Sequence, residues 1–192
     1  LAGSSVGTQT LGMDLSDRAH FRHHLEPGAA PIYVSKPLVG RASGRASIQY
    51  TRRITDADGQ FRGVAVVSFD PQYLNSFYQS VDVGEHGVIA LVGTDGILRA
   101  RSVDMAQTLG KDVSGGELMR RYAESPNGSY RAPSGVDGVA RILSYRKVRD
   151  FPLIVVVGLA EELTHRRVRL DQLGHLVDGR LPVDREVARA QL

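Results

Sequence analysis

The chain carries one eight-residue motif twice: QTLGMDLS at residues 9–16 and QTLGKDVS at residues 107–114, with six of eight letters identical. Such a repeat constrains the fold, because each copy should occupy the same place in a repeated unit. At 192 residues the chain is long enough for two small units. The motif therefore predicts an internally duplicated architecture.

The second copy predicts the order of elements in one unit. Residues 87–102 read as two strands joined by the Asp-Gly pair at 95–96, a dipeptide that favours a hairpin turn. Ser114 and Glu117 form a capping pattern for a helix that the Asn-Gly pair at 127–128 ends. Three strand-like segments follow, at 129–135, 138–148 and 151–160.

The first copy fits the same template. Ser16 can cap a helix over 17–26, and strands are expected at 31–40, 46–54 and 61–70, the last two joined by Asp58-Gly59. Each closing strand leads into a helix, at 71–81 with Asp70 as its cap and at 161–170. The opening strand of the first unit is missing. Residues 1–9 are therefore expected to pair as a strand whose neighbour lies before Leu1.

These patterns predict an α+β fold of two tandem modules, each a mainly antiparallel sheet with covering helices. The first module spans residues 1–80, the second spans 84–163, and a helical tail follows over 164–192. The longest apolar run, PLIVVVGLA at 152–160, is too short to span a membrane and is rich in β-branched residues. It is predicted to be a buried strand.

Composition argues against several functions. The formal net charge is only +3, Lys and Arg are spread along the chain, and there is no Trp, so nucleic acid is not an expected partner. There is also no Cys, which removes disulfides, thiolate chemistry and the commonest zinc ligands. No Gly-x-Ser-x-Gly motif or other catalytic constellation is present, so no enzymatic activity is expected.

Five motifs occur in an order that resembles the double Cache domains, which are tandem PAS-like sensors of bacterial membrane receptors such as histidine kinases and diguanylate cyclases. The similarity covers most of residues 3–163. The motifs are DLSDRAHFRHH (14–24), PLVGRASGRASIQYTRRI (37–54), DGQFRGVAVVSFDPQYL (58–74), DGILRARS (95–102) and ARILSYRKVRDFPLIVVVGLA (140–160).

The resemblance implies the periplasmic, ligand-sensing portion of an inner-membrane receptor, with residues 1–80 as the membrane-distal module. The partner would be a small-molecule ligand, and the full-length receptor would be a membrane-anchored homodimer. Catalytic residues and cofactors are not implied for this portion. Any kinase or cyclase activity would belong to a cytoplasmic part outside this sequence.

In this family the distal module holds its ligand between the sheet and the helix and loop that cover it. Strand alternation places Tyr33 with Ser35 on one face and Tyr50 with Arg52 on one face, and these faces are expected to converge. Because an arginine fork suits a carboxylate, an organic acid is the expected ligand. The candidate ligand-binding residues are Arg18, Phe21, Arg22, Tyr33, Ser35, Tyr50, Arg52 and Asp70.

Each candidate also has an ordinary structural interpretation. Arg18 and Arg22 can form surface salt bridges on their helix, and Asp70 can act only as a helix cap. The histidines of the same helix, His20, His23 and His24, suggest a metal site, but further ligands are lacking and a surface helix is the simpler interpretation. The alternative function is an interaction module with a vestigial pocket that signals through a partner protein.

Overall fold

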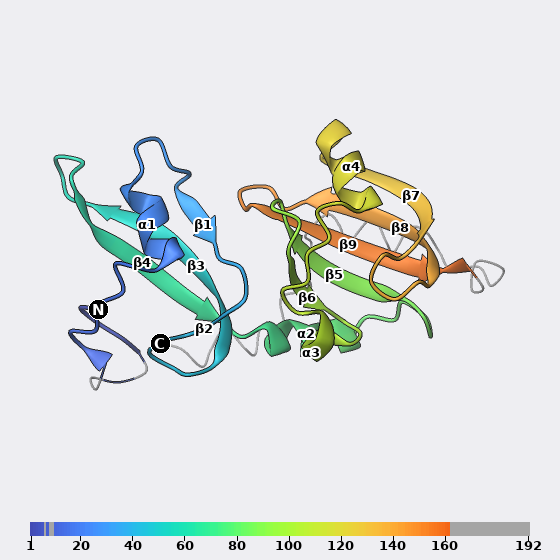
Figure 1. Ribbon diagram of the computed structural model, residues 1–192, viewed down its shortest axis with the longest axis horizontal. Helices are drawn as coiled ribbons and strands as arrows, with labels where there is room; N and C mark the ends of the chain where they lie inside the picture. The colour runs from blue at the N-terminus through green and yellow to red at the C-terminus, as the bar shows by residue number, and fades with distance from the viewer. Residues whose placement is uncertain (6, 8–9, 162–192) are drawn as a thin grey trace.

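The computed structural model describes residues 1–161 except residues 6, 8 and 9. Two antiparallel sheets lie side by side, one from each half of the chain, and a helix leads from the end of the first sheet to run beneath the second (Figure 1). The helices are few and short. The predicted α+β class with antiparallel sheets is therefore confirmed.

The first sheet is organised around its longest strand, β3. Strand β4 pairs with one edge of β3, and the short strands β1 and β2 pair end to end with the other edge. The strand predicted over 31–40 is divided in two, where Pro37 lacks the amide that a ladder needs. The four strands are β1 (Ile32–Val34), β2 (Leu38–Val39), β3 (Ala46–Thr55) and β4 (Phe61–Phe69).

The second sheet has five strands in the order β6-β5-β9-β8-β7. Its part β9-β8-β7 has the same order as β4-β3-β1 in the first sheet, so the two closing strands occupy equivalent places. The apolar run forms β9 and is buried as predicted. The strands are β5 (Val88–Gly93), β6 (Leu98–Arg101), β7 (Asn127–Pro133), β8 (Ala140–Lys147) and β9 (Leu153–Ala160).

Asp70 is the N-cap of α2, because its carboxylate accepts a 2.9 Å hydrogen bond from the Gln72 amide, as predicted. The first helix is shorter than expected, since α1 ends at Arg22 and continues as a 3-10 turn. The helical segments are α1 (Ala19–Arg22), η2 (His23–Leu25), α2 (Pro71–Gln79), α3 (Met105–Thr108) and α4 (Glu117–Glu124).

The repeated motif builds the same turn twice. Gly12 and Gly110 both have φ of 80°, a conformation that favours glycine. Two residues later, the Asp14 and Asp112 carboxylates accept hydrogen bonds from the amides of the following serines, at 2.9 and 2.8 Å. These bonds lower the pKa of both carboxyls. In both copies the glycine and the aspartate of the motif thus set the backbone before a helical segment.

Three sequence predictions are wrong. Ser16 and Ser114 do not cap helices: α1 begins after Arg18 and α4 after Gly116, each without a side-chain cap, because these serines end the Asp turns instead. The described part of residues 1–9 contains no strand, and Leu1 bonds back to the loop at Met13. The helix expected at 161–170, apart from Glu161, and the tail at 164–192 lie outside the described residues.

One apolar core joins the two sheets. The face of the first sheet that carries Val34 and Ile48 packs against Ile89, Leu91 and Val157 of the second sheet. Tyr78 of α2 is buried in the same core, and its burial raises the pKa of its hydroxyl far above the usual range. A separate core lies on the other face of the second sheet, beneath α4. The sheets are therefore packed directly against each other.

Candidate functional site

Strand β3 alternates between two kinds of side chain. Ile48 and Tyr50 face the core shared by the sheets, whereas Ser47, Gln49 and Thr51 face the other way, beneath α1. These three polar side chains are at most 4% exposed, and we call them the polar stripe. A sheet face covered by a helix ordinarily buries apolar side chains. Buried hydroxyl and amide groups therefore mark this face as a candidate binding site.

Hydrogen bonds connect the polar stripe to its surroundings. The Gln49 Nε2 amide donates to Ser47 Oγ at 2.8 Å, and Gln49 Oε1 accepts from Ser68 Oγ at 2.6 Å. The Thr51 hydroxyl lies 2.9 Å from His24 Nε2. Side chains that are buried and hydrogen-bonded in this way have defined orientations, which a recognition site requires.

Two histidines of the covering helical segment lie over the stripe. His20 is 6% exposed and His24 is 1% exposed, so the expectation of a surface helix is wrong for both. Burial lowers the pKa of both imidazoles, which favours the neutral form. His20 Nδ1 has no hydrogen-bond partner among the described residues. A buried nitrogen in this state is costly unless a ligand or water binds it.

Two hollows flank this helical segment. The smaller has a volume of about 380 Å³ and the larger about 510 Å³, and Glu26 lines both. Arginines contribute to each, so their rims carry mixed charge. The smaller is lined by Asp17, Ala19, Arg22, His23, Glu26 and Tyr33. The larger is lined by residues 26–31 with His24, Arg52, Arg53, Thr55 and Gly59.

Four predicted residues lie on the helix-covered side. The Arg18 guanidinium donates to the Val39 carbonyl at 3.1 Å and so joins α1 to β2. The Phe21 ring packs edge-to-face on Phe61, with centroids 5.7 Å apart. Arg22 and Tyr33 line the smaller hollow. Burial raises the pKa of the Tyr33 hydroxyl, which keeps it protonated as a donor.

Ser35 also lies on this side and is 2% exposed. Its hydroxyl accepts from the Gln49 amide at 2.9 Å and donates to the Lys36 carbonyl at 2.7 Å. Ser35 therefore holds the backbone that positions Gln49.

The predicted convergence of the two strand faces is wrong. The register pairs Val34 with Tyr50 and Tyr33 with Thr51, so Tyr50 lies on the face opposite Tyr33. The Tyr50 ring packs edge-on against Phe69 and Phe151, each at 6.1 Å, in the shared core.

Arg52 shares the face of Tyr50 and is exposed where it lines the larger hollow. Asp70 is engaged as the cap of α2.

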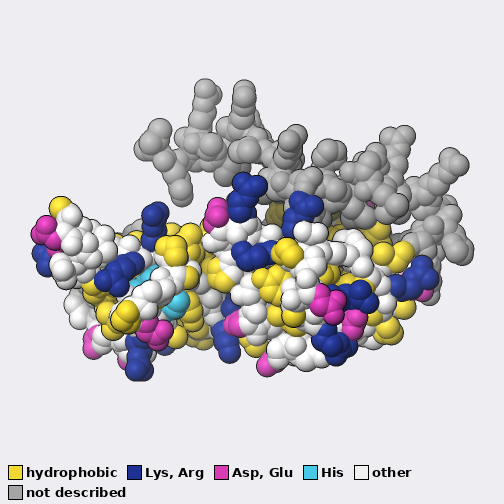
Figure 2. All heavy atoms as spheres, turned by 90° about the horizontal axis from the view of Figure 1, so that it is seen from above, with side chains coloured by type: hydrophobic (Ala, Val, Ile, Leu, Met, Phe, Trp, Pro, Cys, Tyr) yellow, Lys and Arg dark blue, Asp and Glu magenta, His cyan; other side chains and the backbone are white. Residues whose placement is uncertain are grey.

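Charge and metal chemistry offer no second candidate on this side. Within the described ranges, no three His, Asp, Glu or Cys side chains are placed to hold a metal ion. Figure 2 shows Lys and Arg side chains scattered among acidic and apolar ones on the uncovered part of its face, rather than gathered into one patch. The polar stripe is therefore the feature that distinguishes this half of the molecule.

Acid should destabilise the chain through the two buried histidines. Because their folded-state pKa values are lowered, stability is fully present above the unfolded value of about 6.5 and falls as the pH drops below it. We expect the melting temperature to fall between pH 7.5 and pH 5. The fall should be smaller in His20→Gln and unchanged in a control variant at the exposed His86. Equal falls in all three proteins would contradict this assignment.

Comparison with known proteins places this fold among sensor domains. A family model described as a histidine kinase sensor domain, dCache_1-like, matches residues 71–158. The extracellular domain of rpHK1S-Z16, described as a histidine kinase, is 30% identical with a TM-score of 0.74. The match covers 85% of this chain and 67% of that one. No curated protein is significantly similar in sequence.

Two chemoreceptor domains share the fold. The periplasmic sensory domain of Campylobacter jejuni Tlp1 is 16% identical with a TM-score of 0.58, over 74% of this chain. The ligand-binding domain of Pseudomonas fluorescens CtaA, in complex with L-alanine, is 19% identical with a TM-score of 0.56, over 79%. The chain spans only 53% and 63% of these two domains.

The fold and the comparisons define a sensor domain that lies outside the cytoplasm in membrane receptors. The chain belongs to the dCache_1-like family of histidine kinase sensor domains. The family resemblance noted in the sequence is thereby confirmed. In the described part of the chain, no helix is both long enough and apolar enough to cross a membrane.

Proposed function

We propose that this chain is the ligand-sensing portion of a bacterial membrane receptor, of the histidine kinase type rather than the diguanylate cyclase type, and that it binds a small organic acid. The observation that supports this proposal is the polar stripe beneath α1, together with His20 Nδ1, which has no hydrogen-bond partner in the part of the chain that the structure describes. The histidine kinase type is favoured because both the matching family model and rpHK1S-Z16 bear that description.

The proposed ligand site lies in a first PAS-like module, residues 1–80, and a second module, residues 84–163, relays the signal. The order shared by β4-β3-β1 and β9-β8-β7 and the doubled Asp turn support this division. In the full-length receptor the domain is membrane-anchored and dimeric. The output domain lies on the cytoplasmic side.

The chemistry of the site favours a carboxylate with further polar groups. Arg18 and Arg22 of the helical segment supply guanidinium donors, and Tyr33 supplies a protonated hydroxyl. Gln49 and Thr51 offer hydrogen bonds on the sheet side. Ligands named for structural neighbours, L-alanine for CtaA and asparagine for Mlp24, also carry a carboxylate. An organic acid uses the same recognition.

Signalling follows from the two faces of β3. A ligand that binds better when α1 closes over the polar stripe shifts the domain toward that closed state. Because Ile48 on the same strand packs in the shared core, any displacement of β3 changes the packing against the second sheet. This arrangement also disfavours the alternative of a partner-driven module with a vestigial pocket, since such a module does not need buried polar groups on this face.

A thermal-shift panel of organic acids, amino acids, polyamines, purines and divalent cations tests the proposal. We expect one class of carboxylate to raise the melting temperature by mass action. Gln49→Ala should weaken the binding of that ligand by about tenfold or more, since it removes a buried hydrogen-bonding group worth roughly 1–3 kcal/mol. Arg22→Ala should also weaken it.

Matched controls come from the same half of the chain. Gln60→Ala and Arg62→Ala change an exposed amide and an exposed guanidinium and should leave the ligand's affinity unchanged. A ligand that binds equally well to Gln49→Ala and Arg22→Ala would place the site elsewhere. If no carboxylate raises the melting temperature, the partner-driven module becomes the favoured function.

A further inference from the structure

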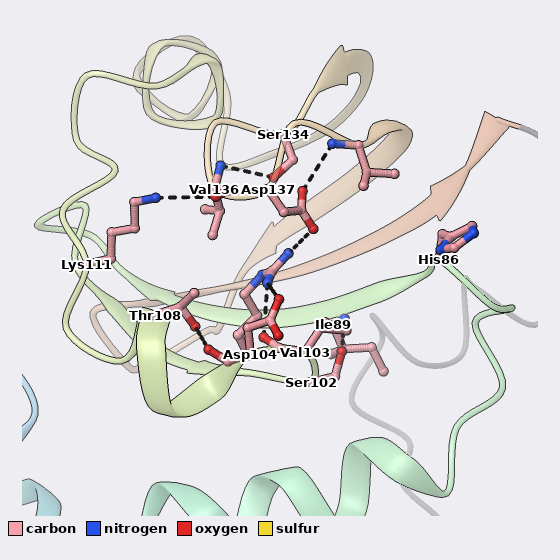
Figure 3. Close-up of polar contacts among 12 residues, drawn as sticks. His86, Ile89, Ser102, Val103, Asp104, Thr108, Lys111, Ser134, Val136 and Asp137 are labelled. Atoms are coloured by element: carbon pink, nitrogen blue, oxygen red, sulfur yellow. Dashed lines mark hydrogen bonds and ion pairs between the residues drawn. The ribbon is translucent and has the colours of Figure 1, made fainter.

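A second buried polar cluster lies around Asp137, on the face of the second sheet that carries α4 (Figure 3). Arg101 of β6 and Arg141 of β8 converge on the carboxylate of Asp137. The Arg141 fork donates to both carboxylate oxygens, at 2.8 and 2.9 Å, and Arg101 Nη2 donates to Oδ2 at 2.5 Å. The two arginine side chains are 3% and 2% exposed.

Strands β5 and β9 separate the two arginines in the sheet, and one glycine lets them meet. A Cβ atom on Gly158 of β9 would lie 2.9 Å from Arg141 Cδ and 2.9 Å from Val88 Cγ1. The stem of Arg141 therefore crosses the sheet over a position that has no side chain. Arg141 Nε is fixed by the His86 carbonyl at 2.7 Å, so the guanidinium is oriented before any anion reaches it.

The charges of this cluster do not balance within its buried part. Two buried guanidinium groups face a single carboxylate that is 18% exposed. The other acid, Asp104, is 60% exposed and 3.8 Å from Arg101, and Lys111 reaches toward the same turn by donating to the Val136 carbonyl at 3.4 Å. Burial raises the pKa of the Asp137 carboxyl, but hydrogen bonds from the two arginines lower it by more. The pKa therefore lies well below its usual range. The two guanidinium groups therefore favour an anionic partner over a neutral one.

Asp137 reaches the arginines from a short turn rather than from the sheet. The turn between β7 and β8 is closed by two backbone bonds between Ser134 and the residues Gly138 and Val139, and Gly138 has φ of 74°. Because Asp137 belongs to this turn while both arginines belong to strands, the carboxylate can leave without disturbing the pair.

From this geometry we propose that Arg101 and Arg141 form a second small-carboxylate site, which the chain's own Asp137 occupies here. A ligand carboxylate replaces Asp137 on the two guanidinium groups, and the turn at 134–139 moves away from the sheet. This second site does not depend on the proposed ligand site beneath α1. It gives the second sheet a direct response to carboxylates.

Removing the internal carboxylate tests the proposal. In Asp137→Ala, sodium acetate or formate should raise the melting temperature saturably, by roughly 3–6 °C at ten times the dissociation constant, and sodium chloride at equal ionic strength should not. The wild-type chain should respond at a concentration about tenfold higher or more, because its site is already occupied. Both proteins are compared in a Gln49→Ala background, so that binding beneath α1 does not contribute.

The matched control is Glu117→Ala, which removes a carboxylate from the solvent-accessible pairs with Arg120 and Arg121. It should show no acetate-specific response. If Asp137→Ala does not fold in plain buffer, folding in acetate but not in chloride supports the site. The proposal would be overturned if acetate and chloride had the same effect on the melting temperature of Asp137→Ala and if acetate caused no saturable change in the NMR chemical shift of the Gly138 amide in the wild type.

Discussion

Asp137→Asn should lower the free energy of unfolding by about 3 kcal/mol, because it leaves the buried Arg101 and Arg141 facing a neutral amide. This is the lower end of the range for breaking a buried ion pair, since the Asp137 side chain is 18% exposed. Urea unfolding at neutral pH measures the difference without adding salt. A loss below about 1 kcal/mol would mean that the arginines are solvated.

The same substitution should remove a pH dependence. Because the folded-state pKa of Asp137 is lowered, its contribution is fully present above the unfolded value of about 3.9 and is lost as the pH falls toward the folded value. The difference between the wild type and Asp137→Asn should therefore shrink below pH 4. Asp17→Asn, on an exposed ion pair, should change the free energy of unfolding far less at neutral pH, because solvent screens such pairs.

Ile48→Ala should destabilise both sheets at once. Ile48 is fully buried in the core that joins them, and truncating a buried isoleucine costs about 2–5 kcal/mol. Because the core is shared, we expect one cooperative unfolding transition in the wild type and lower hydrogen-exchange protection in β5 and β9 as well as in β3 of the variant.

The control for this prediction lies on the same strand. Ile54 of β3 is 46% exposed, so Ile54→Ala should cost well under 1.5 kcal/mol. If Ile48→Ala reduced protection only in the first sheet, the sheets would unfold independently and the shared core would contribute little. That result would also remove the route proposed here from the ligand site to the second sheet.

Local turn chemistry made much of the fold predictable. The Asp-Gly pairs at 58–59, 95–96 and 137–138 all form turns between strands, with each glycine at positive φ. The apolar alternation and runs located the strands. The serine caps failed because an aspartate two residues earlier captured the serine amide, a competing local bond.

The candidate site was less predictable. Ser47, Gln49 and Thr51 recur at every second position, which is a visible signal, but polar residues at this spacing ordinarily face solvent. Tyr50 was assigned to the ligand side although the pairing of β1 with β3 places it in the core. Register depends on contacts between distant segments, and no local pattern in this chain specifies which face α1 covers. Similarly, the burial of His20 and His24 follows only from the tertiary position of their helix.

The alternation along β3 has a consequence for how such receptors diversify. Positions of the proposed ligand site and positions of the shared core are interleaved on one strand, so substitutions at Ser47, Gln49 and Thr51 leave in place the neighbours that hold the sheets together. Under the proposed function, ligand selectivity and the packing between the sheets therefore depend on different residues. A library that varies these three positions among hydrogen-bonding residues should change the chemical preference of the proposed site while the shared core keeps the sheets packed, a practical starting point for building biosensors.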